Sequence, residues 1–439
     1  MSDGMTYIHD IGQFTLVCAN CGATAAGTSK RFRCACGTPF DLSLDTLAQD
    51  ATVEALRARF AARLSALSGP ERSGVWRYRE LALPLADEHI VSRQEGNTPL
   101  YAVGAAEREA WRSIGVYAGV EALYLKHEGH NPTGSFKDRG MTVGMSIAKA
   151  LGARAVACAS TGNTSASLAA YAAQAGIPAL VFLPAGKVAT GKLAQSVAYG
   201  ARQIAVAGDF DDAMRQVESV AERLGIYLLN SINPYRLAGQ RSIGYELLHQ
   251  LQWQAPDWVA LPAGNLGNTA AIGAALVRAA EVGLIARVPR LAAVQAARAN
   301  PFYQSYADQW RGFAPVHAST RASAINIGAP VSYARARAMI EATRGVVTEV
   351  TDDEIFATKA RIDRAGIGCE PASAASVAGV RRLVREGVIA PGETVVAILT
   401  GHVLKDPEQA TASEPEAGAE VSDLLRAIAE TLQASSPRA

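Results

Sequence analysis

The stretch 126–141, KHEGHNPTGSFKDRGM, contains the residue best suited to covalent chemistry, Lys137. An apolar run at 122–125 predicts a short buried strand before it, and apolar periodicity predicts a helix after it. Ser135 and Asp138 have the spacing of a capping box, which places Lys137 in the first helical turn. A partly desolvated lysine near the positive end of a helix dipole loses its proton more easily, and the neutral amine can form a Schiff base with an aldehyde. The alternative is an ordinary surface lysine in a first turn.

Three further turns follow predicted strands and carry polar residues. The turn 160–165, STGNTS, offers hydroxyls, an amide and backbone N–H groups for a carboxylate or a ring oxygen. The turn 264–268, GNLGN, has glycines that let backbone N–H groups approach a phosphate. Thr400 follows the run 395–399, and its hydroxyl can meet a heterocyclic nitrogen. Together with Lys137, these turns predict a pocket for a phosphorylated aldehyde ring, and pyridoxal phosphate is such a ring.

Composition and charge limit the class of protein. The 439 residues suffice for roughly two or three domains with sizeable cores. Hydrophobic residues make up 49% and charged residues 19% of the chain, as in ordinary globular proteins, and the net charge of +1 favours neither nucleic acid nor an anionic membrane as a partner. No apolar run is long enough to span a bilayer, and the first ten residues lack a signal-peptide layout. We therefore expect a cytoplasmic protein.

Four of the six cysteines are close together near the N-terminus, at Cys18, Cys21, Cys34 and Cys36. In a reducing compartment such a group indicates metal ligands before disulfides, and a glycine after each pair permits a tight turn. The second pair has one intervening residue where a zinc ribbon usually has two. A structural zinc ion is therefore expected, with a vestigial ribbon of free thiols as the alternative and His9 as a poor substitute ligand.

The rest of the chain alternates between strand-like and helix-like segments, which predicts an α/β fold with parallel sheets covered by helices on both faces. Besides 122–125, strands are expected at 155–159, 179–183, 203–207, 227–229, 258–261, 291–294, 346–350 and 395–399. Ligands then belong at the carboxyl ends of the strands. A helix is expected at 44–68. Residues 411–420 are expected to form a linker, and 421–439 a terminal helix that docks on the body.

The motif EGHNPTGSFKDRG at 128–140 resembles the cofactor-lysine motif of threonine synthases, which are fold type II pyridoxal-phosphate enzymes. The resemblance covers nearly the whole chain, including the cysteine ribbon. It extends over 95–100, 160–167, 184–187, 191–195, 230–236, 264–268, 370–376 and 399–407. The resemblance implies two parallel-sheet α/β domains with the cofactor between them. We expect the large domain at 46–137 and 236–410, the small inserted domain at 138–235, the ribbon at 1–45, and the linker and C-terminal helix at 411–439.

The resemblance also implies roles for single residues. Lys137 would hold pyridoxal phosphate covalently and move protons between substrate carbons. Asn163 would contact the ring oxygen and Thr400 would face the pyridine nitrogen. The cofactor phosphate would be held by Gly264, Asn265, Leu266, Gly267 and Asn268.

The same resemblance implies how the substrate is bound. Thr161 and Thr164 would bind its carboxylate, whereas Asn230, Ser231 and Arg236 would bind its phosphate. The last assignment also has independent physical support, because an arginine near a hydroxyl and an amide forms a natural phosphate clamp.

One segment departs from the family pattern. In 323–330, SAINIGAP, Asn326 stands where the family usually has arginine, and Ala329 where it has a polar residue. The change is either neutral drift or an altered interdomain contact or substrate pocket.

The expected activity is that of a threonine synthase, a carbon–oxygen lyase that converts O-phospho-L-homoserine and water to L-threonine and phosphate. Its partner is a small phosphorylated amino acid, and we expect a homodimer. One alternative is a sister enzyme, such as a cysteate synthase, that replaces the phosphate with another nucleophile. Another is a catalytically silent binding module that keeps the fold. The sequence does not define the nucleophile or any allosteric control.

Overall fold

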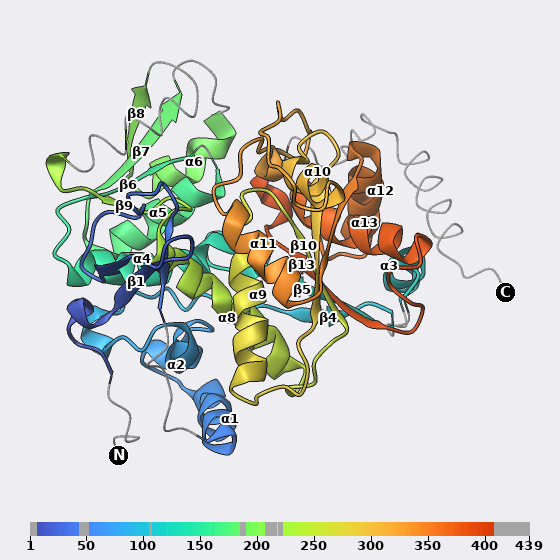
Figure 1. Ribbon diagram of the computed structural model, residues 1–439, viewed down its shortest axis with the longest axis horizontal. Helices are drawn as coiled ribbons and strands as arrows, with labels where there is room; N and C mark the ends of the chain where they lie inside the picture. Colours follow the sequence, from blue (N-terminus) through green and yellow to red (C-terminus); the bar gives the residue numbers. More distant parts are fainter. Residues whose placement is uncertain are drawn as a thin grey trace, which may run out of the picture. The chain divides into compact units, whose positions relative to one another are not determined.

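The computed structural model describes most of the chain up to Pro407 (Figure 1). The described residues are 7–43, 52–104, 108–120, 122–160, 162–184, 190–206, 217 and 223–407. Within them the strands form three sheets, of six, four and three strands. The linker expected at 411–420 and the terminal helix expected at 421–439 lie outside the described residues. None of the described helices is long and apolar enough to span a membrane.

The six-stranded sheet has the order β12-β11-β10-β13-β5-β4, and every pair in it is parallel except the β4–β5 pair at the edge. Its strands are β4 (Leu100–Ala102), β5 (Ala122–His127), β10 (Trp258–Pro262), β11 (Arg290–Ala296), β12 (Val346–Val350) and β13 (Thr394–Leu399). The strands expected in this part of the chain are confirmed. Sequence analysis did not predict β4, which is short and gains its hydrogen bonds from β5 alone.

The four-stranded sheet is parallel throughout, with the order β8-β7-β6-β9. Its strands are β6 (Val156–Ala159), β7 (Ala179–Pro184), β8 (Arg202–Val206) and β9 (Tyr227–Leu228). All four match predicted strands to within a residue or so at each end. The fold is therefore the expected α/β arrangement, with the carboxyl ends of parallel strands available for a site.

Helices cover both faces of the six-stranded sheet. Neighbouring residues of a strand point to opposite faces, so the contacts of β10 show which helices lie on each side. Trp258 and Ala260 pack with α3 (Glu109–Ala118), α12 (Asp352–Arg364) and α13 (Pro371–Arg385). Val259 and Leu261 pack on the other side with α8 (Pro234–Gln250), α9 (Gly267–Glu281) and α11 (Tyr333–Ala342). The short helix α10 (Pro301–Ala307) follows β11.

The four-stranded sheet shares its core with α4 (Lys137–Ala150) and α5 (Asn163–Ala175), and α6 (Thr190–Ala198) lies between β7 and β8 in the chain. Helix α8 belongs to both cores, since Tyr235 packs with this sheet and Ile243 with the larger one. Helices α4 and α8 approach closely because residue 239 is glycine, and a Cβ there would collide with the Arg139 carbonyl. This close packing fixes the position of the first turn of α4 relative to the first turn of α8.

The segment between the ribbon and the main body is less helical than expected. Instead of a helix over 44–68, the structure has α1 (Val53–Ala62) followed by a 3-10 turn, and α2 (Arg79–Ala82) further on, while 44–51 lies outside the described residues. Helix α1 starts where the Thr52 side chain accepts a hydrogen bond from the Ala55 N–H at 3.2 Å. The cap fixes the start of the helix later than composition suggested.

The N-terminal segment forms a small antiparallel sheet of β1 (Thr15–Cys18), β2 (Thr24–Ala26) and β3 (Phe40–Leu42), with the order β2-β1-β3. It contacts α8, because the Tyr235 hydroxyl donates to the Gly27 carbonyl at 2.7 Å. It also contacts α11, through an ion pair of 2.6 Å between Arg335 and Asp41. The domain boundaries given above stay a prediction.

Candidate active site

Lys137 is the first residue of α4, as expected, but the helix begins differently from the prediction. The capping-box prediction is wrong, because the N-cap residue is Phe136 and it makes no side-chain cap. The Asp138 carboxylate turns back and accepts hydrogen bonds from the Thr133 N–H at 2.7 Å and from the Ser167 hydroxyl at 2.6 Å. Ser135 instead pairs through its backbone with Gly401. The start of α4 is thus fixed by contacts with distant segments rather than by a local cap.

The Lys137 side chain lies partly buried and without a counter-ion in direct contact. Among the described residues it makes no hydrogen bond, and its Nζ lies 4.3 Å from the centre of the Phe136 ring. Burial and, to a smaller extent, the positive charge of Arg236 lower the pKa of Lys137 to about 7, although the negative charge of Glu370 acts in the opposite direction. A large share of this amine is therefore neutral near pH 7, which a nucleophilic lysine requires.

Thr400 lies beside the start of α4, because the Phe136 N–H donates to the Thr400 carbonyl at 3.0 Å. Its hydroxyl is 2.9 Å from the Glu370 carboxylate, which also accepts a hydrogen bond of 2.9 Å from the Asn163 side-chain amide. The predicted ring-contacting residues Asn163 and Thr400 are therefore brought together by a third residue, Glu370. Sequence analysis gave Glu370 no role, although it precedes the proline that starts α13.

The turn 264–268 lies between β10 and α9, as expected. Leu266 caps α9 with a left-handed backbone at φ 65°. The Asn265 amide donates to the Ser231 hydroxyl at 2.7 Å and accepts from the Val331 N–H at 2.7 Å. Asn268 and Thr269 are buried, and their side-chain oxygens and the Asn268 amide nitrogen have no partner among the described residues. Buried polar atoms are normally paired, so these atoms indicate the place of a missing polar partner.

Arg236 lies in the first turn of α8, because Asn233 caps the helix and Pro234 starts it. The guanidinium is buried, and one nitrogen donates to the Leu229 carbonyl at 3.1 Å. Its Nε and its other terminal nitrogen have no partner among the described residues. Burial lowers the pKa of Arg236 to about 10. A buried cation with free donors is a suitable partner for an anion.

The remaining residues of the predicted substrate site are placed as follows. Both ends of the Asn230 amide bond to the backbone of Ala159, at 3.1 and 3.0 Å, so this side chain ties the end of β6 to the segment after β9. Ser231 contacts Asn265 of the 264–268 turn. Thr164 lies in the first turn of α5. Thr161 lies outside the described residues.

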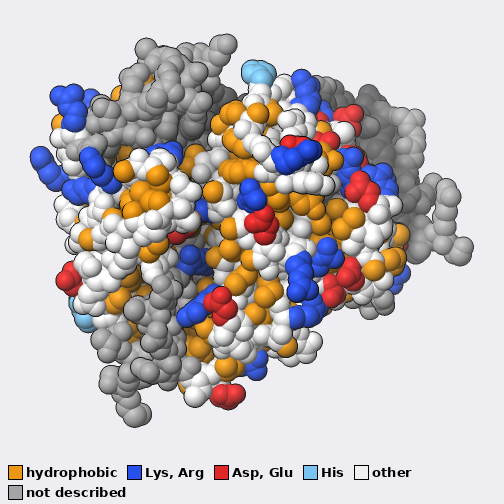
Figure 2. Space-filling view, viewed as in Figure 1, with side chains coloured by type: hydrophobic (Ala, Val, Ile, Leu, Met, Phe, Trp, Pro, Cys, Tyr) orange, Lys and Arg blue, Asp and Glu red, His pale blue; other side chains and the backbone are white. Residues whose placement is uncertain are grey.

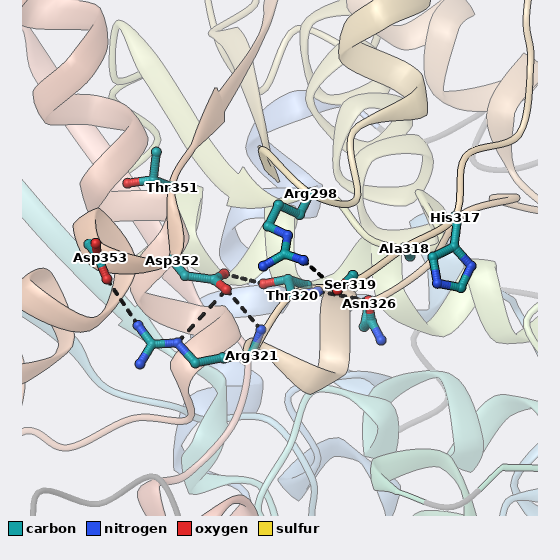
Figure 3. Close-up of a pocket in the computed structure, with 10 residues that line it drawn as sticks. All are labelled: Arg298, His317, Ala318, Ser319, Thr320, Arg321, Asn326, Thr351, Asp352 and Asp353. Carbon is teal, nitrogen blue, oxygen red and sulfur yellow. Dashed lines mark hydrogen bonds and ion pairs between the residues drawn. The ribbon is translucent and has the colours of Figure 1, made fainter.

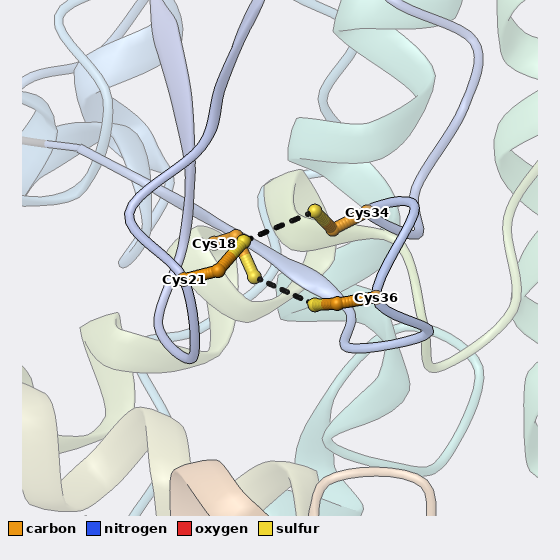
Figure 4. A group of neighbouring side chains, drawn as sticks. All are labelled: Cys18, Cys21, Cys34 and Cys36. Carbon is orange, nitrogen blue, oxygen red and sulfur yellow. Dashed lines mark hydrogen bonds between the residues drawn. The ribbon is translucent and has the colours of Figure 1, made fainter.

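The four cysteines of the ribbon converge, as Figure 4 shows. Their sulfur atoms all lie within 4.8 Å of one another, with Cys18 at 3.5 Å from Cys36 and Cys21 at 3.5 Å from Cys34. The glycines after the two pairs, Gly22 and Gly37, have φ values of 71° and 84°, which glycine adopts most easily. The single intervening residue in the second pair does not prevent the sulfurs from meeting.

A polar cavity of about 650 Å³ lies at the ends of β11 and β12, and none of the residues predicted to bind cofactor or substrate is among those that line it (Figure 3). Its lining contains Arg298, Arg321, Asp352 and Asn326, the residue that departs from the family pattern. The Asn326 side chain accepts a hydrogen bond of 3.1 Å from the Thr320 N–H. Acidic and basic groups are also interspersed on the surface in Figure 2. Because Asp352 pairs with Arg321, this cavity offers no clear charge preference.

Comparison with known proteins agrees with this geometry. Residues 91–401 match the family described as pyridoxal-phosphate dependent enzyme. The chain is 44% identical over 404 residues to a threonine synthase of Methanocaldococcus jannaschii, covering 91% of this chain and 95% of the relative. It is 41% identical to threonine synthase 2, chloroplastic, of Arabidopsis thaliana, covering 80% of this chain and 68% of the relative.

Solved structures of lower identity share the fold. A threonine deaminase isoform of Solanum lycopersicum superposes with a TM-score of 0.61 at 20% identity, covering 81% of this chain and 94% of the other. Maize serine racemase superposes with a TM-score of 0.60 at 19% identity, covering 88% and 98%. The chain thus belongs to the pyridoxal-phosphate dependent enzymes of fold type II. Within them, the curated relatives reported above are threonine synthases.

The residues present fit this cofactor. Lys137 supplies an amine that is not paired within the described structure, and its lowered pKa suits attachment to an aldehyde. The turn 264–268 at the start of α9, with unpartnered polar atoms on Asn268 and Thr269, suits a phosphate. Asn163 and Thr400 offer hydrogen-bonding groups near the start of α4, where Lys137 lies.

Proposed function

We propose that the chain acts as a threonine synthase and converts O-phospho-L-homoserine and water to L-threonine and phosphate. The observation that carries this proposal is the Lys137 amine, which has a pKa of about 7 and no hydrogen-bonding partner among the described residues. Identity above 40% to threonine synthases over most of the chain supports the choice of reaction.

When bound, pyridoxal phosphate supplies the electron sink for carbanion chemistry. Lys137 would hold the cofactor and, once released, would take a proton from one substrate carbon and return it at another. An amine with a pKa near 7 is suited to both directions of proton transfer at neutral pH. Asn163 and Thr400 would orient the ring, and residues 264–268 would hold the cofactor phosphate.

The substrate's phosphate would be bound by Arg236, with Ser231 and Asn230 beside it. Two of the three guanidinium nitrogens of Arg236 have no partner among the described residues, so their N–H groups are available to an anion. Asn230 already uses both of its polar atoms on Ala159, which leaves one N–H of the amide for the substrate. Thr161 and Thr164 would bind the substrate carboxylate through hydroxyls near the N-terminus of α5.

An assay of the two products tests the proposal. Purified protein loaded with pyridoxal phosphate should release phosphate and L-threonine from O-phospho-L-homoserine in equal amounts. Phosphate release that requires added sulfite, with a sulfonated product, would favour the sister synthase. A protein that binds the cofactor but releases neither product would favour the inactive binding module.

The cysteine cluster would hold one structural zinc ion. A tetrahedral site with Zn–S bonds of about 2.3 Å requires sulfurs roughly 3.8 Å apart, and the observed separations have the right scale. With four protein ligands the ion would have no open position, so its role would be to stabilise the ribbon that contacts α8 and α11. The homodimer, the cytoplasmic location and the domain boundaries remain predictions.

A further inference from the structure

The carboxylate of Glu370 connects two side chains that approach it from different segments. Its Oε2 accepts a hydrogen bond from the Asn163 amide, on α5, and its Oε1 accepts one from the Thr400 hydroxyl, after β13, both at 2.9 Å. The Glu370 N–H also donates to the Gly401 carbonyl at 3.0 Å. Glu370 therefore joins the four-stranded and six-stranded parts of the fold next to the start of α4, where Lys137 lies.

The surroundings leave little freedom to this carboxylate. Glu370 is 4% exposed, and a Cβ on residue 401 would collide with its carboxyl group, which explains the glycine there. Burial raises the pKa of Glu370, while the hydrogen bonds from Asn163 and Thr400 and the charges of Lys405 and Lys137 lower it. The position of the carboxyl group thus fixes the positions of the two side chains that bond to it.

The ionised carboxylate also determines how the Thr400 hydroxyl is oriented. A carboxylate only accepts hydrogen bonds, and a hydroxyl has a single proton to donate. When that proton points to Glu370, Thr400 can only accept hydrogen bonds from its other neighbours. The Ser373 hydroxyl lies 2.9 Å from the Thr400 hydroxyl and accepts from the Gly401 N–H at 3.0 Å, so its proton can point to Thr400, in preference to the more distant Gly401 carbonyl at 3.5 Å.

The geometry points to Glu370 as a positioning residue for the cofactor ring: its carboxylate orients the Asn163 amide and makes the Thr400 hydroxyl a hydrogen-bond acceptor. This inference rests on the proposed function, because Asn163 and Thr400 are there expected to contact the ring oxygen and the ring nitrogen. An acceptor at Thr400 favours a protonated ring nitrogen.

The test is the substitution Glu370→Gln, which keeps the shape but replaces one acceptor oxygen by an NH₂ donor. The Asn163 amide and the Thr400 hydroxyl can then no longer both donate to residue 370, so one contact is broken or reversed. Cofactor-free protein is titrated with pyridoxal phosphate, and binding is followed by tryptophan fluorescence and by the absorption spectrum. We expect the Kd for pyridoxal phosphate to rise about tenfold to a hundredfold, the loss typical of a hydrogen bond to a charged group. We also expect the absorption maximum of the bound cofactor to shift.

Two variants serve as comparisons. The first is Glu349→Gln, on the edge strand β12. The Glu349 carboxylate also accepts a hydrogen bond from an asparagine amide, that of Asn300, at 2.5 Å. This variant should bind the cofactor with wild-type affinity and spectrum. Glu370→Asp keeps the charge but shortens the side chain, so its Kd should rise less than that of Glu370→Gln.

A purely structural role for Glu370 would lower thermal stability without moving the spectrum of the bound cofactor. Wild-type affinity and spectrum in folded Glu370→Gln would overturn the inference. If Glu370→Gln does not fold, wild-type affinity and spectrum in Glu370→Asp would overturn the inference. Failure of the proposed function gives a different result, because the wild-type protein would then bind no pyridoxal phosphate or release no threonine.

Discussion

Two lysines in the same stretch of chain, the buried Lys126 and the partly buried Lys137, have opposite surroundings. Lys126 Nζ donates to the Glu246 carboxylate at 2.6 Å, to the Gln250 side chain at 2.7 Å and to the Thr98 carbonyl at 2.8 Å. These three partners use all the donors of an ammonium group. Lys137 has no hydrogen-bonding partner among the described residues, and the charge with the largest influence on its pKa is another cation, Arg236.

The surroundings of Lys126 extend into a network of buried ion pairs. Arg139 bonds to the Glu128 carboxylate at 2.6 Å and to Glu246 at 2.9 Å, and all these side chains are buried. Sequence analysis did not predict the network, because its members come from β5, the 3-10 turn that follows it, α4 and α8, and meet only in the fold. Buried charges that serve the structure are thus paired within it, whereas the unpaired ones lie where a ligand is expected.

Removing the unpaired lysine should have the largest effect on activity. In Lys137→Ala we expect kcat/KM for O-phospho-L-homoserine to fall on the order of ten-thousandfold or more, because both cofactor attachment and proton transfer are lost. The melting temperature of the cofactor-free protein should not fall, since no hydrogen bond within the described structure is removed. Steady-state phosphate release measures kcat/KM, and a thermal melt measures the melting temperature. Substantial residual turnover would mean that another residue performs the chemistry.

Removing the paired lysine, Lys126, should instead lower the stability of the protein. Lys126→Met leaves Glu246 with fewer partners, and breaking a buried ion pair costs about 3–5 kcal/mol of unfolding free energy. Lys149→Met is the matched control on exposed α4 surface, where the change should stay within about 0.5 kcal/mol. Urea unfolding of the cofactor-free proteins gives both values. If Lys126→Met is as stable as the control, the network is not a stabilising element.

Two buried arginines offer the same comparison between an unpaired and a paired cation, and we expect smaller effects from their removal. In Arg236→Ala we expect kcat/KM for the phosphorylated substrate to fall about a hundredfold, from the loss of about 2–3 kcal/mol of charged hydrogen bonding. Arg236→Lys should recover only part of it, because an ammonium lacks the planar fork. Cofactor loading should be unchanged. Arg335→Ala, a buried arginine paired with Asp41 of the ribbon, should lower stability but not kcat/KM. Normal turnover by Arg236→Ala would place the phosphate clamp elsewhere.

The cysteine ribbon should give the smallest effect on activity. Protein purified without chelator should contain close to one zinc ion per chain, and Cys18→Ser with Cys21→Ser should contain none. The melting temperature should fall, while kcat at saturating substrate should change less than about threefold, because a closed structural site takes no part in the reaction. Metal analysis that finds no zinc, with four thiols that titrate freely, would identify a vestigial ribbon.

The sequence predicted the elements around the site better than the contacts within it. The positions of Lys137, 264–268 and Thr400 at strand ends or helix starts followed from local periodicity and turn residues, and the structure has them there. The capping role of Ser135 failed, because Asp138 is drawn to Thr133 and Ser167, and the latter is distant in sequence. The role of Glu370 was not visible, since its two partners come from α5 and from the segment after β13.

The most direct test of the account is the site and pH dependence of cofactor attachment. Cofactor-free protein is mixed with pyridoxal phosphate at several pH values, reduced with borohydride, digested and mapped. We predict a single label on Lys137, with a yield that rises as pH increases through about 7 and then levels off, because the amine is protonated below its pKa and neutral above it. A label on Lys126 or another lysine, or a yield that keeps rising toward pH 10 as for an ordinary lysine with a pKa of about 10.4, would contradict the account.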